Sequence, residues 1–232
     1  MSKRFWLIAA GIVALLAVAV SIVDGRAGDD RAPETAAPPS AAAKGKVGPL
    51  GDLARRTPGD PRAIGQVDAP VVMVVLSDFR CPYCAEYEKT VQPKLVRKYV
   101  DPGVLRIEWR DDPVFGEQSE LAARAGWAAA AQGRFWQFAE AVYRDVPETG
   151  HPDLPIDVLV DRAKTAGVKD LKRFRGEALG DTYAAKVKQD QEPVRTFGIS
   201  GTPTFVVNGE PMIGVQPMDV FERLVDDAAG PR

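Results

Sequence analysis

V-V-M-V-V-L-S-D-F-R-C-P-Y-C, residues 71–84, is the stretch that decides how this chain folds. Its apolar run, residues 71–76, predicts a short buried strand, and residues 77–80 predict a turn leading into a helix that opens at the cysteines. Cys81 is therefore expected at a helix N-terminus, where unsatisfied backbone N–H groups and the positive end of the helix dipole favour a thiolate. We predict that the pKa of Cys81 lies below the value of about 8.5 of a free cysteine.

Cys81 and Cys84 are the only cysteines among the 232 residues, and together they indicate a redox-active pair. A structural disulfide between such close neighbours closes almost no loop, so it would stabilise the fold little through chain entropy. A zinc site needs four ligands, and the chain offers only these two cysteines and the single His151 besides its carboxylates. We interpret Cys81 as the nucleophile and Cys84 as the resolving cysteine, and we expect no metal.

The composition fits one globular domain with extensions. Hydrophobic residues make up 45% and charged residues 27% of the chain, and the net charge is −2, which excludes a disordered chain and a basic surface for nucleic acid. The sequence has no Ser-His-Asp pattern and no phosphate-binding glycine loop. The acidic pairs Asp111-Asp112 and Asp226-Asp227 are interpreted as solvated charge rather than as acid–base catalysts.

Residues 1–23 are predicted to be a signal anchor that crosses the membrane. Lys3 and Arg4 precede an uncharged run, residues 5–23, that is long enough to span a bilayer as a helix. This positive flank keeps the N-terminus in the cytoplasm and exports the rest of the chain. Small residues at 25–27 leave a cleaved signal peptide, and hence secretion, as the alternative. We expect a single-pass protein of the cell membrane with an extracytoplasmic domain.

Residues 24–62 are predicted to be a low-complexity linker. They are rich in Ala, Pro and Gly and show little apolar periodicity, so they bury too little surface to fold alone. Residues 50–56 have a short helical pattern, and the sequence leaves open whether they pack on the domain. Residues 63–230 are long enough to build a core without a structural disulfide.

The folded domain alternates between strand and helix patterns. Residues 104–110 predict a half-exposed strand with Leu105, Ile107 and Trp109 on its apolar face. Residues 117–197 follow a helical pattern, and Asn208-Gly209 predicts a hairpin turn. The helix that begins at Cys81 is expected to be interrupted at Pro93, and the last helix of the helical block is expected over 181–197. Hairpin strands are expected over 204–207 and 212–215, followed by an amphipathic helix over 217–228. This order predicts an α/β fold with a mixed sheet flanked by helices.

Gly201-Thr202-Pro203 precedes the first hairpin strand. A proline at the head of a strand, preceded by a glycine, is compatible with a cis peptide bond. An ordinary trans proline that marks the strand edge remains the alternative on these residues alone.

The two motifs together resemble the DsbA-like branch of the thioredoxin superfamily. The resemblance covers residues 63–229 and consists of C-P-Y-C after a buried strand, G-T-P-T-F at 201–205 before a hairpin, and the helical block between them. It implies a thioredoxin-like fold with a DsbA-type helical insertion at about residues 117–197. It also implies that a cis-proline loop lies against the cysteine pair. The residues that this resemblance places around a bound substrate segment are Phe79, Pro82, Tyr83, Thr202 and Pro203.

The resemblance implies an enzyme, an extracytoplasmic thiol–disulfide oxidoreductase. It would introduce disulfides into unfolded exported proteins as a monomer, with the Cys81–Cys84 disulfide and no other cofactor. A membrane partner linked to quinone, of the DsbB or vitamin K epoxide reductase kind, would reoxidise it. Two alternatives remain: a reductase or isomerase of the same fold, and a membrane-tethered peptide-binding module that uses the apolar surface around Phe79, Tyr83, Thr202 and Phe205.

One position departs from the family pattern. The family commonly carries a buried acid six residues before the first cysteine, where it assists proton transfer at the second, and this chain has Val75 there. Asp78 is interpreted first as a turn or helix-cap residue and only then as a catalytic helper. Arg80 either adds positive charge beside Cys81 or points to solvent. The missing acid leaves the direction of electron flow open.

Overall fold

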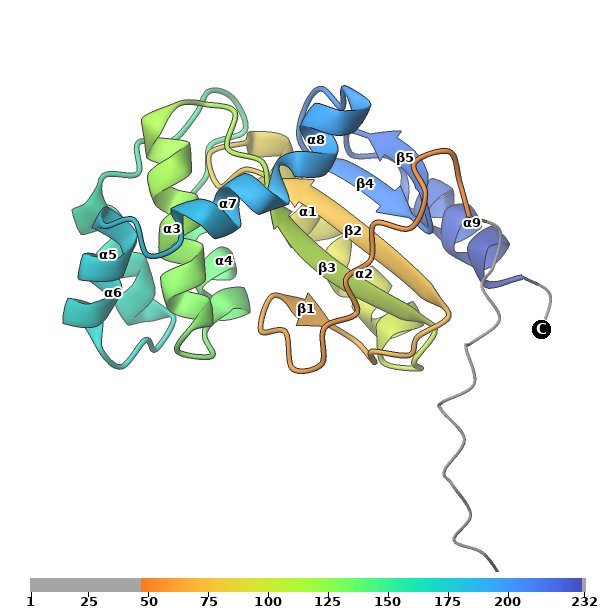
Figure 1. The fold of residues 1–232 in the computed structure, drawn as a ribbon, viewed down its shortest axis with the longest axis horizontal. Helices are drawn as coiled ribbons and strands as arrows, with labels where there is room; N and C mark the ends of the chain where they lie inside the picture. The colour runs from red at the N-terminus through yellow and green to blue at the C-terminus, as the bar shows by residue number, and fades with distance from the viewer. Residues whose placement is uncertain (1–46, 231–232) are drawn as a thin grey trace, which may run out of the picture. The chain divides into compact units, whose positions relative to one another are not determined.

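The computed structural model describes residues 47–230 (Figure 1). The predicted signal anchor and the linker up to residue 46 lie outside the described residues. Within residues 47–230, no helix is both long and apolar enough to cross a membrane.

A five-stranded mixed sheet forms the centre of the domain, in the order β1-β3-β2-β4-β5. The central strand β2 (Val71–Ser77) runs parallel to β3 (Leu105–Asp111) and antiparallel to β4 (Thr204–Val207). The edge strands are β1 (Ala63–Ile64), antiparallel to β3, and β5 (Glu210–Ile213), antiparallel to β4. The predicted mixed sheet is confirmed, whereas the two-residue β1 is too short to leave a pattern in the sequence.

The predicted hairpin is present, but its second strand begins two residues earlier than expected. Asn208 and Gly209 both have positive φ, 44° and 89°, as a two-residue hairpin turn requires. Such a turn pairs the residues on either side of it directly. Val207 therefore pairs with Glu210, and β5 begins at residue 210 instead of residue 212.

One face of the sheet is covered by the helix that follows the cysteines and by the last helix of the chain. Val71, Met73 and Val75 on β2 pack against both. The elements on this face are α1 (Pro82–Thr90), α2 (Gln92–Leu95), the π-helix η1 (Val96–Val100) and α9 (Met218–Ala229). The predicted interruption at Pro93 is confirmed, because α1 ends at Thr90 and Pro93 lies in the first turn of α2.

Residues 47–62 cover the other face of the sheet. Leu50, Leu53 and Ala54 pack on Val72, Val74 and Val206, which point away from the first face. The backbone of this segment bonds to the hairpin turn, with Gly48 N donating to Asn208 O over 2.8 Å. A Cβ atom on Gly48 would lie 2.4 Å from the Gly209 carbonyl carbon, so only glycine permits this approach. The predicted linker is therefore wrong for residues 47–62, which belong to the domain.

The prediction that β3 is a half-exposed strand, made from its alternation of apolar and charged residues, is wrong. Its charged residues Arg106, Glu108 and Arg110 are as buried as the apolar residues between them. Glu108 accepts hydrogen bonds from both arginines at 2.8 Å and from the backbone N–H groups of Arg55 and Arg56 at 2.9 Å. Burial opposes ionisation, but these hydrogen bonds and the Arg110 charge prevail and lower the pKa of Glu108 to about 2.

A second group of buried charges joins residues 47–62 to the sheet and to the helical insertion. Arg62 binds Asp111 at 2.8 Å and Asp190 at 2.9 Å, and Arg55 binds the other oxygen of Asp190 at 2.7 Å. The guanidinium of Arg62 also stacks over Trp127, 4.0 Å from the ring centre. The expectation that Asp111 and Asp112 are solvated is therefore wrong, since both are buried.

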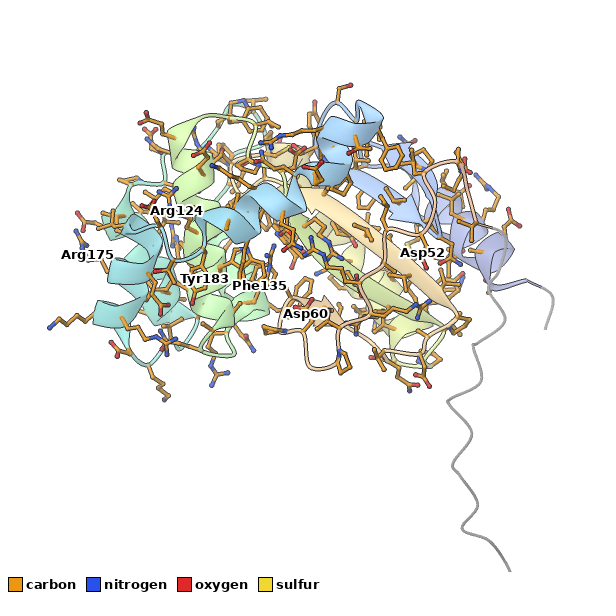
Figure 2. All side chains as sticks on the ribbon, in the orientation of Figure 1. Asp52, Asp60, Arg124, Phe135, Arg175 and Tyr183 are labelled. Carbon is orange, nitrogen blue, oxygen red and sulfur yellow. The ribbon has the colours of Figure 1, made fainter. Side chains whose placement is uncertain are left out.

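The helical insertion packs around its own apolar core next to the sheet. Phe135 and Trp109 connect the two parts with ring centroids 5.3 Å apart, and Figure 2 shows Phe135 at this junction. Its helices are α3 (Glu117–Ala130), α4 (Phe135–Tyr143), α5 (Ile156–Thr165), α6 (Leu171–Leu179), α7 (Ala184–Asp190) and α8 (Glu192–Phe197). The helix predicted over 181–197 is split, because Pro193 lacks the N–H that a continuous helix needs.

The buried charges on β3 predict a stability change that depends on pH. Replacing Glu108→Gln leaves two buried guanidinium groups without their anion, so we expect a loss of about 3–5 kcal/mol in the free energy of unfolding at neutral pH. The pKa of Glu108 is lowered on folding, so its contribution is present above its unfolded pKa and is lost as the pH falls towards about 2. Urea denaturation at several pH values measures this.

The matched control is Asp219→Asn, which breaks an exposed pair with Arg223. We expect that variant to keep nearly all of its stability, because exposed ion pairs contribute little. Equal losses for the two variants would contradict the role given to Glu108.

Candidate active site

Cys81 is the N-cap residue of α1, in extended backbone conformation, and Pro82 occupies the first turn of the helix. The chain reverses between β2 and α1 because the Cys81 N–H donates to the Asp78 carbonyl over 3.1 Å. The prediction that Cys81 stands at a helix N-terminus is confirmed. Both cysteines are free thiols in the structure.

The loop before β4 lies directly against Cys81. The Cys81 thiol donates a hydrogen bond to the Thr202 carbonyl over 3.2 Å, although 121 positions separate the two residues. The Thr202–Pro203 peptide bond is cis, as the resemblance to the DsbA-like branch implied. Antiparallel pairing of β2 with β4 brings the two motifs to the same end of the sheet.

The two cysteines have very different acidities. A hydrogen bond from the Cys84 thiol is the largest influence on Cys81. With help from the Thr202 side chain and the backbone N–H groups of residues 83 and 84, it outweighs burial and lowers the pKa of Cys81 to about 6. Burial, the hydrogen bond with Cys81 and the Cys81 charge raise the pKa of Cys84 well above 9.0. Near neutral pH the reduced site therefore holds one thiolate, on Cys81, and one thiol, on Cys84.

Asp78 and Arg80 shape the turn rather than act on the cysteines. The Asp78 carboxylate accepts hydrogen bonds from the backbone N–H groups of Arg80, Val114 and Phe115 at 2.8, 2.7 and 3.3 Å. The Arg80 side chain turns away from Cys81 and donates to the carbonyls of Phe115 and Pro152 at 2.6 and 2.8 Å. The interpretation of Asp78 as a turn residue is confirmed, and Arg80 is anchored to two loops instead of reaching solvent or the thiolate.

The structure separates the aromatic residues that the sequence placed at the site. Tyr83 is 60% exposed between the cysteines, and Pro82 is half-buried beside it. Phe79 is only 1% exposed and stacks on Trp109 with ring centroids 5.1 Å apart, so the expectation that it contacts a substrate is wrong. Phe205 is buried too, because its side chain points into the core beneath β4.

Sequence reasoning missed the polar residues beneath Cys84. Ser77, the last residue of β2, hydrogen-bonds to Cys84 and lies 3.1 Å from the Tyr143 hydroxyl. Tyr143 comes from α4 and also donates to the Asp78 carbonyl over 3.0 Å. The place of Ser77 at a strand end gave a signal for it, whereas nothing near Tyr143 in the sequence points to the site.

Among residues 47–230, no group of three or more His, Cys, Asp or Glu side chains is arranged to hold a metal ion. His151 lies in a loop near the active-site turn, where its ring stacks on Phe115 with centroids 3.7 Å apart and its Nδ1 lies 3.1 Å from the Arg80 carbonyl oxygen.

Comparison with known proteins agrees with this geometry. The protein-family profile described as Thioredoxin matches residues 57–227. The chain belongs to this family. Its two-cysteine helix end, cis-proline loop and helical insertion identify it as a DsbA-like thiol–disulfide oxidoreductase.

Individual relatives and solved structures are similar to this chain over most of the folded domain. The chain is 30% identical over 151 residues to a protein of Bacillus cereus named probable disulfide bond formation protein D, an alignment that covers 64% of this chain and 70% of the relative. The crystal structure of oxidised BdbD from Bacillus subtilis superposes with a TM-score of 0.67 at 25% identity, covering 73% of this chain and 93% of that one. The α-DsbA1 structure from Wolbachia pipientis, at 21% identity and a TM-score of 0.64, covers 75% and 92% and shares the fold.

The hydrogen bond from Cys84 predicts how the pKa of Cys81 responds to substitution. A hydrogen bond to a charged group contributes about 1.5–3 kcal/mol, and each pKa unit corresponds to about 1.4 kcal/mol. Replacing Cys84→Ala removes the donor and should raise the pKa of Cys81 by roughly one to two units, whereas Cys84→Ser keeps a donor and should leave it near the wild-type value. The pH dependence of alkylation of Cys81 by iodoacetamide measures both. Identical profiles for the two variants would refute this cause of the low pKa.

Proposed function

We propose that this protein introduces disulfide bonds into exported polypeptides through the Cys81–Cys84 pair. The observation that carries the proposal is the low pKa of Cys81, about 6, beside a Cys84 thiol that stays protonated. A stable thiolate favours the reduced form of the enzyme and is also a good leaving group, and both properties make the disulfide form oxidising.

The proposed reaction moves two electrons from the client to the enzyme. A client thiolate attacks Cys81 Sγ of the oxidised enzyme, a client–Cys81 disulfide forms, the Cys81–Cys84 bond breaks, and Cys84 leaves as a thiolate that takes up a proton. A second client thiolate then attacks the client sulfur of the mixed disulfide. Cys81 leaves as its stabilised thiolate, and the client carries a new disulfide.

Client binding is proposed beside the cysteine pair. A cavity of about 440 Å³ lies next to Tyr83. Its lining combines the apolar Pro82, Val146 and Pro147 with the charged Glu86, Lys89 and Glu148, which suits a client segment that carries an apolar side chain beside polar ones. On the other side of Cys81, the Thr202 hydroxyl is buried and lies close enough to the thiol to help lower its pKa. This hydroxyl and the backbone beside Pro203 can hold an extended client segment while Cys81 reacts.

We propose that the reduced enzyme is reoxidised outside the cytoplasm. The reduced dithiol needs an electron acceptor, and we propose a membrane partner linked to quinone, of the DsbB or vitamin K epoxide reductase kind. The apolar run at residues 5–23, as a signal anchor, would keep the domain near that partner. The name of the Bacillus cereus relative, disulfide bond formation protein, supports this direction of electron flow.

A peptide-binding module without redox activity has less support. Two of the four residues proposed for its apolar surface, Phe79 and Phe205, are buried in the core. A reductase of the same fold is the second candidate. It has less support, because Val75 stands where the family commonly has an acid, and a weaker proton route for Cys84 hinders the reductase direction more than the oxidase direction.

The direct test of the proposed function is a client assay with cysteine variants. The oxidised wild-type protein should form disulfides in a reduced, unfolded client. Cys84→Ala, first loaded with glutathione as a mixed disulfide on Cys81, should exchange the glutathione for a client thiol and accumulate a disulfide between Cys81 and the client, because Cys84 is no longer there to release the client. Cys81→Ala should do neither. Mass spectrometry of acid-quenched samples measures all three. Client oxidation that persists in Cys81→Ala would exclude the proposed role of this cysteine.

The reduction potential of the pair should depend on pH in two regimes. Between the two cysteine pKa values, about 6 and above 9.0, the reduced enzyme binds one proton per two electrons, so the potential should change by about 30 mV per pH unit. Below the pKa of Cys81 two protons are bound, and the slope should double to about 60 mV per pH unit. Equilibration with glutathione buffers gives the potential. We expect it above about −200 mV near neutral pH, and a value near the −270 mV of thioredoxin would favour the reductase.

A further inference from the structure

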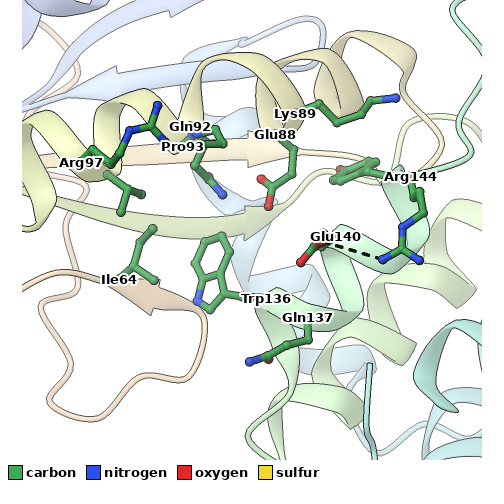
Figure 3. Close-up of a pocket in the computed structure, with 12 residues that line it drawn as sticks. Ile64, Glu88, Lys89, Gln92, Pro93, Arg97, Trp136, Gln137, Glu140 and Arg144 are labelled. Atoms are coloured by element: carbon green, nitrogen blue, oxygen red, sulfur yellow. Dashed lines mark ion pairs between the residues drawn. The ribbon is translucent and has the colours of Figure 1, made fainter. Parts of the chain in front are cut away.

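Glu88 lies one helical turn beyond Cys84 on α1. Residues four apart on a helix leave the same face, with Cβ atoms about 5–6 Å from each other. Cys84 is buried, and the Glu88 carboxyl is directed into the cavity between α1 and α4 that Figure 3 shows. An ionisable side chain therefore stands close to the sulfur that has to gain and lose a proton in the redox cycle.

The cavity is large and polar enough to hold water. Its volume is about 630 Å³, and Glu88, Gln92, Trp136, Glu140 and Tyr143 contribute to its wall. Two polar atoms in this wall, Glu88 Oε2 and Trp136 Nε1, are buried without a hydrogen-bond partner among the described residues. Buried polar atoms of this kind normally bond to ordered water where the site has room for it.

The wall of this cavity extends to the surroundings of Cys84. The Tyr143 ring lines the cavity, and its hydroxyl lies 3.1 Å from Ser77 Oγ. Ser77 in turn hydrogen-bonds to Cys84. Tyr143 and Ser77 therefore connect the wall of the cavity to the buried thiol.

We propose that Glu88 supplies and removes the proton of Cys84 through water in this cavity, in place of the buried acid that is absent at Val75. The proposal rests on the redox roles proposed above for Cys81 and Cys84. In the oxidising direction, the Cys84 thiolate takes the proton of the Glu88 carboxyl, and the Glu88 carboxylate recovers a proton from solvent through the cavity. In the reverse direction, the Glu88 carboxylate accepts the Cys84 proton before Cys84 attacks a mixed disulfide on Cys81.

The protonation state of Glu88 suits this role. Burial, assisted by the charge of Glu140 and opposed by a hydrogen bond with Gln92, raises the pKa of Glu88 to about 8. Both of its forms are then populated near neutral pH, as a proton donor and acceptor requires. The titratable or charged groups that face Glu88 or line its cavity are Cys84, Tyr87 and Lys89 of α1, Arg97 of η1, and Glu140, Tyr143 and Arg144 of α4.

Asp78 is the competing acid near Cys84, and its geometry suits it less. Its two carboxylate oxygens already accept three backbone N–H groups, from Arg80, Val114 and Phe115. Protonation of Asp78 would weaken the turn that holds Cys81, whereas Glu88 Oε2 has no such partner to lose.

The test is the rate at which Cys84 releases glutathione from Cys81. Reduced enzyme is mixed with oxidised glutathione, quenched in acid at timed intervals and analysed by mass spectrometry across a range of pH. In the wild type, the release step should accelerate as the pH rises through the pKa of Glu88, about 8. In Glu88→Gln, this inflection should disappear and the rate at that pH should fall roughly tenfold or more, since general base assistance is lost.

Glu140→Gln is the second variant, and it does not remove the proposed relay. Glu140 is an exposed member of the same cavity wall, paired with Arg144 at 3.8 Å, and its charge helps to raise the pKa of Glu88. Its replacement should shift the inflection to lower pH without lowering the maximal rate. Glu120→Gln, an exposed position on α3, should leave the profile unchanged.

A Glu88→Gln profile that coincides with the wild type would overturn the proposal. If Glu88→Gln does not fold, the wild-type profile decides, because a release rate without an inflection near pH 8 would exclude Glu88 as the proton acceptor. Failure of the proposed function would look different, because glutathione would then leave Cys84→Ala as fast as it leaves the wild type.

Discussion

The contact between Cys81 Sγ and the Thr202 carbonyl, 3.2 Å long, is the interaction on which the site depends. It joins the helix end after β2 to the cis-proline loop before β4, two segments that only the antiparallel pairing of these strands brings together. The sulfur held there has a pKa of about 6, first because Cys84 donates to it and then because the Thr202 side chain and helix N–H groups add to that effect. Fold and chemistry are therefore specified by the same few residues.

The rest of the domain keeps this site in place. Residues 47–62 cover one face of the sheet, and the buried group of Arg55, Arg62, Asp111 and Asp190 connects them to β3 and α7. The helical insertion closes the site from below with Tyr143. Burial of the Cys84 thiol and its interaction with Cys81 raise the pKa of Cys84, so the two sulfurs differ in acidity although they lie on the same helical turn.

The sequence allowed prediction of what depends on local pattern. The buried run before Cys81, the helix end, the hairpin at Asn208-Gly209 and the helical insertion are all present. Burial of charge could not be predicted, because the alternation of arginine and glutamate in β3 is the same whether the polar face meets water or counter-ions. The direction in which a side chain points could not be predicted from the sequence either. For this reason the sequence analysis assigned Phe79 to the site and did not identify Glu88. The surroundings of Glu88 are set by α4, about fifty positions away.

The central claim is that the folded site stabilises a thiolate on Cys81, and its most direct test is a pH titration of the ultraviolet absorbance of the thiolate in the reduced protein. The oxidised protein serves as the baseline. The account predicts that one thiolate appears with a pKa of about 6 while Cys84 stays protonated beyond 9.0. A single transition near the ordinary cysteine value of about 8.5 would contradict it.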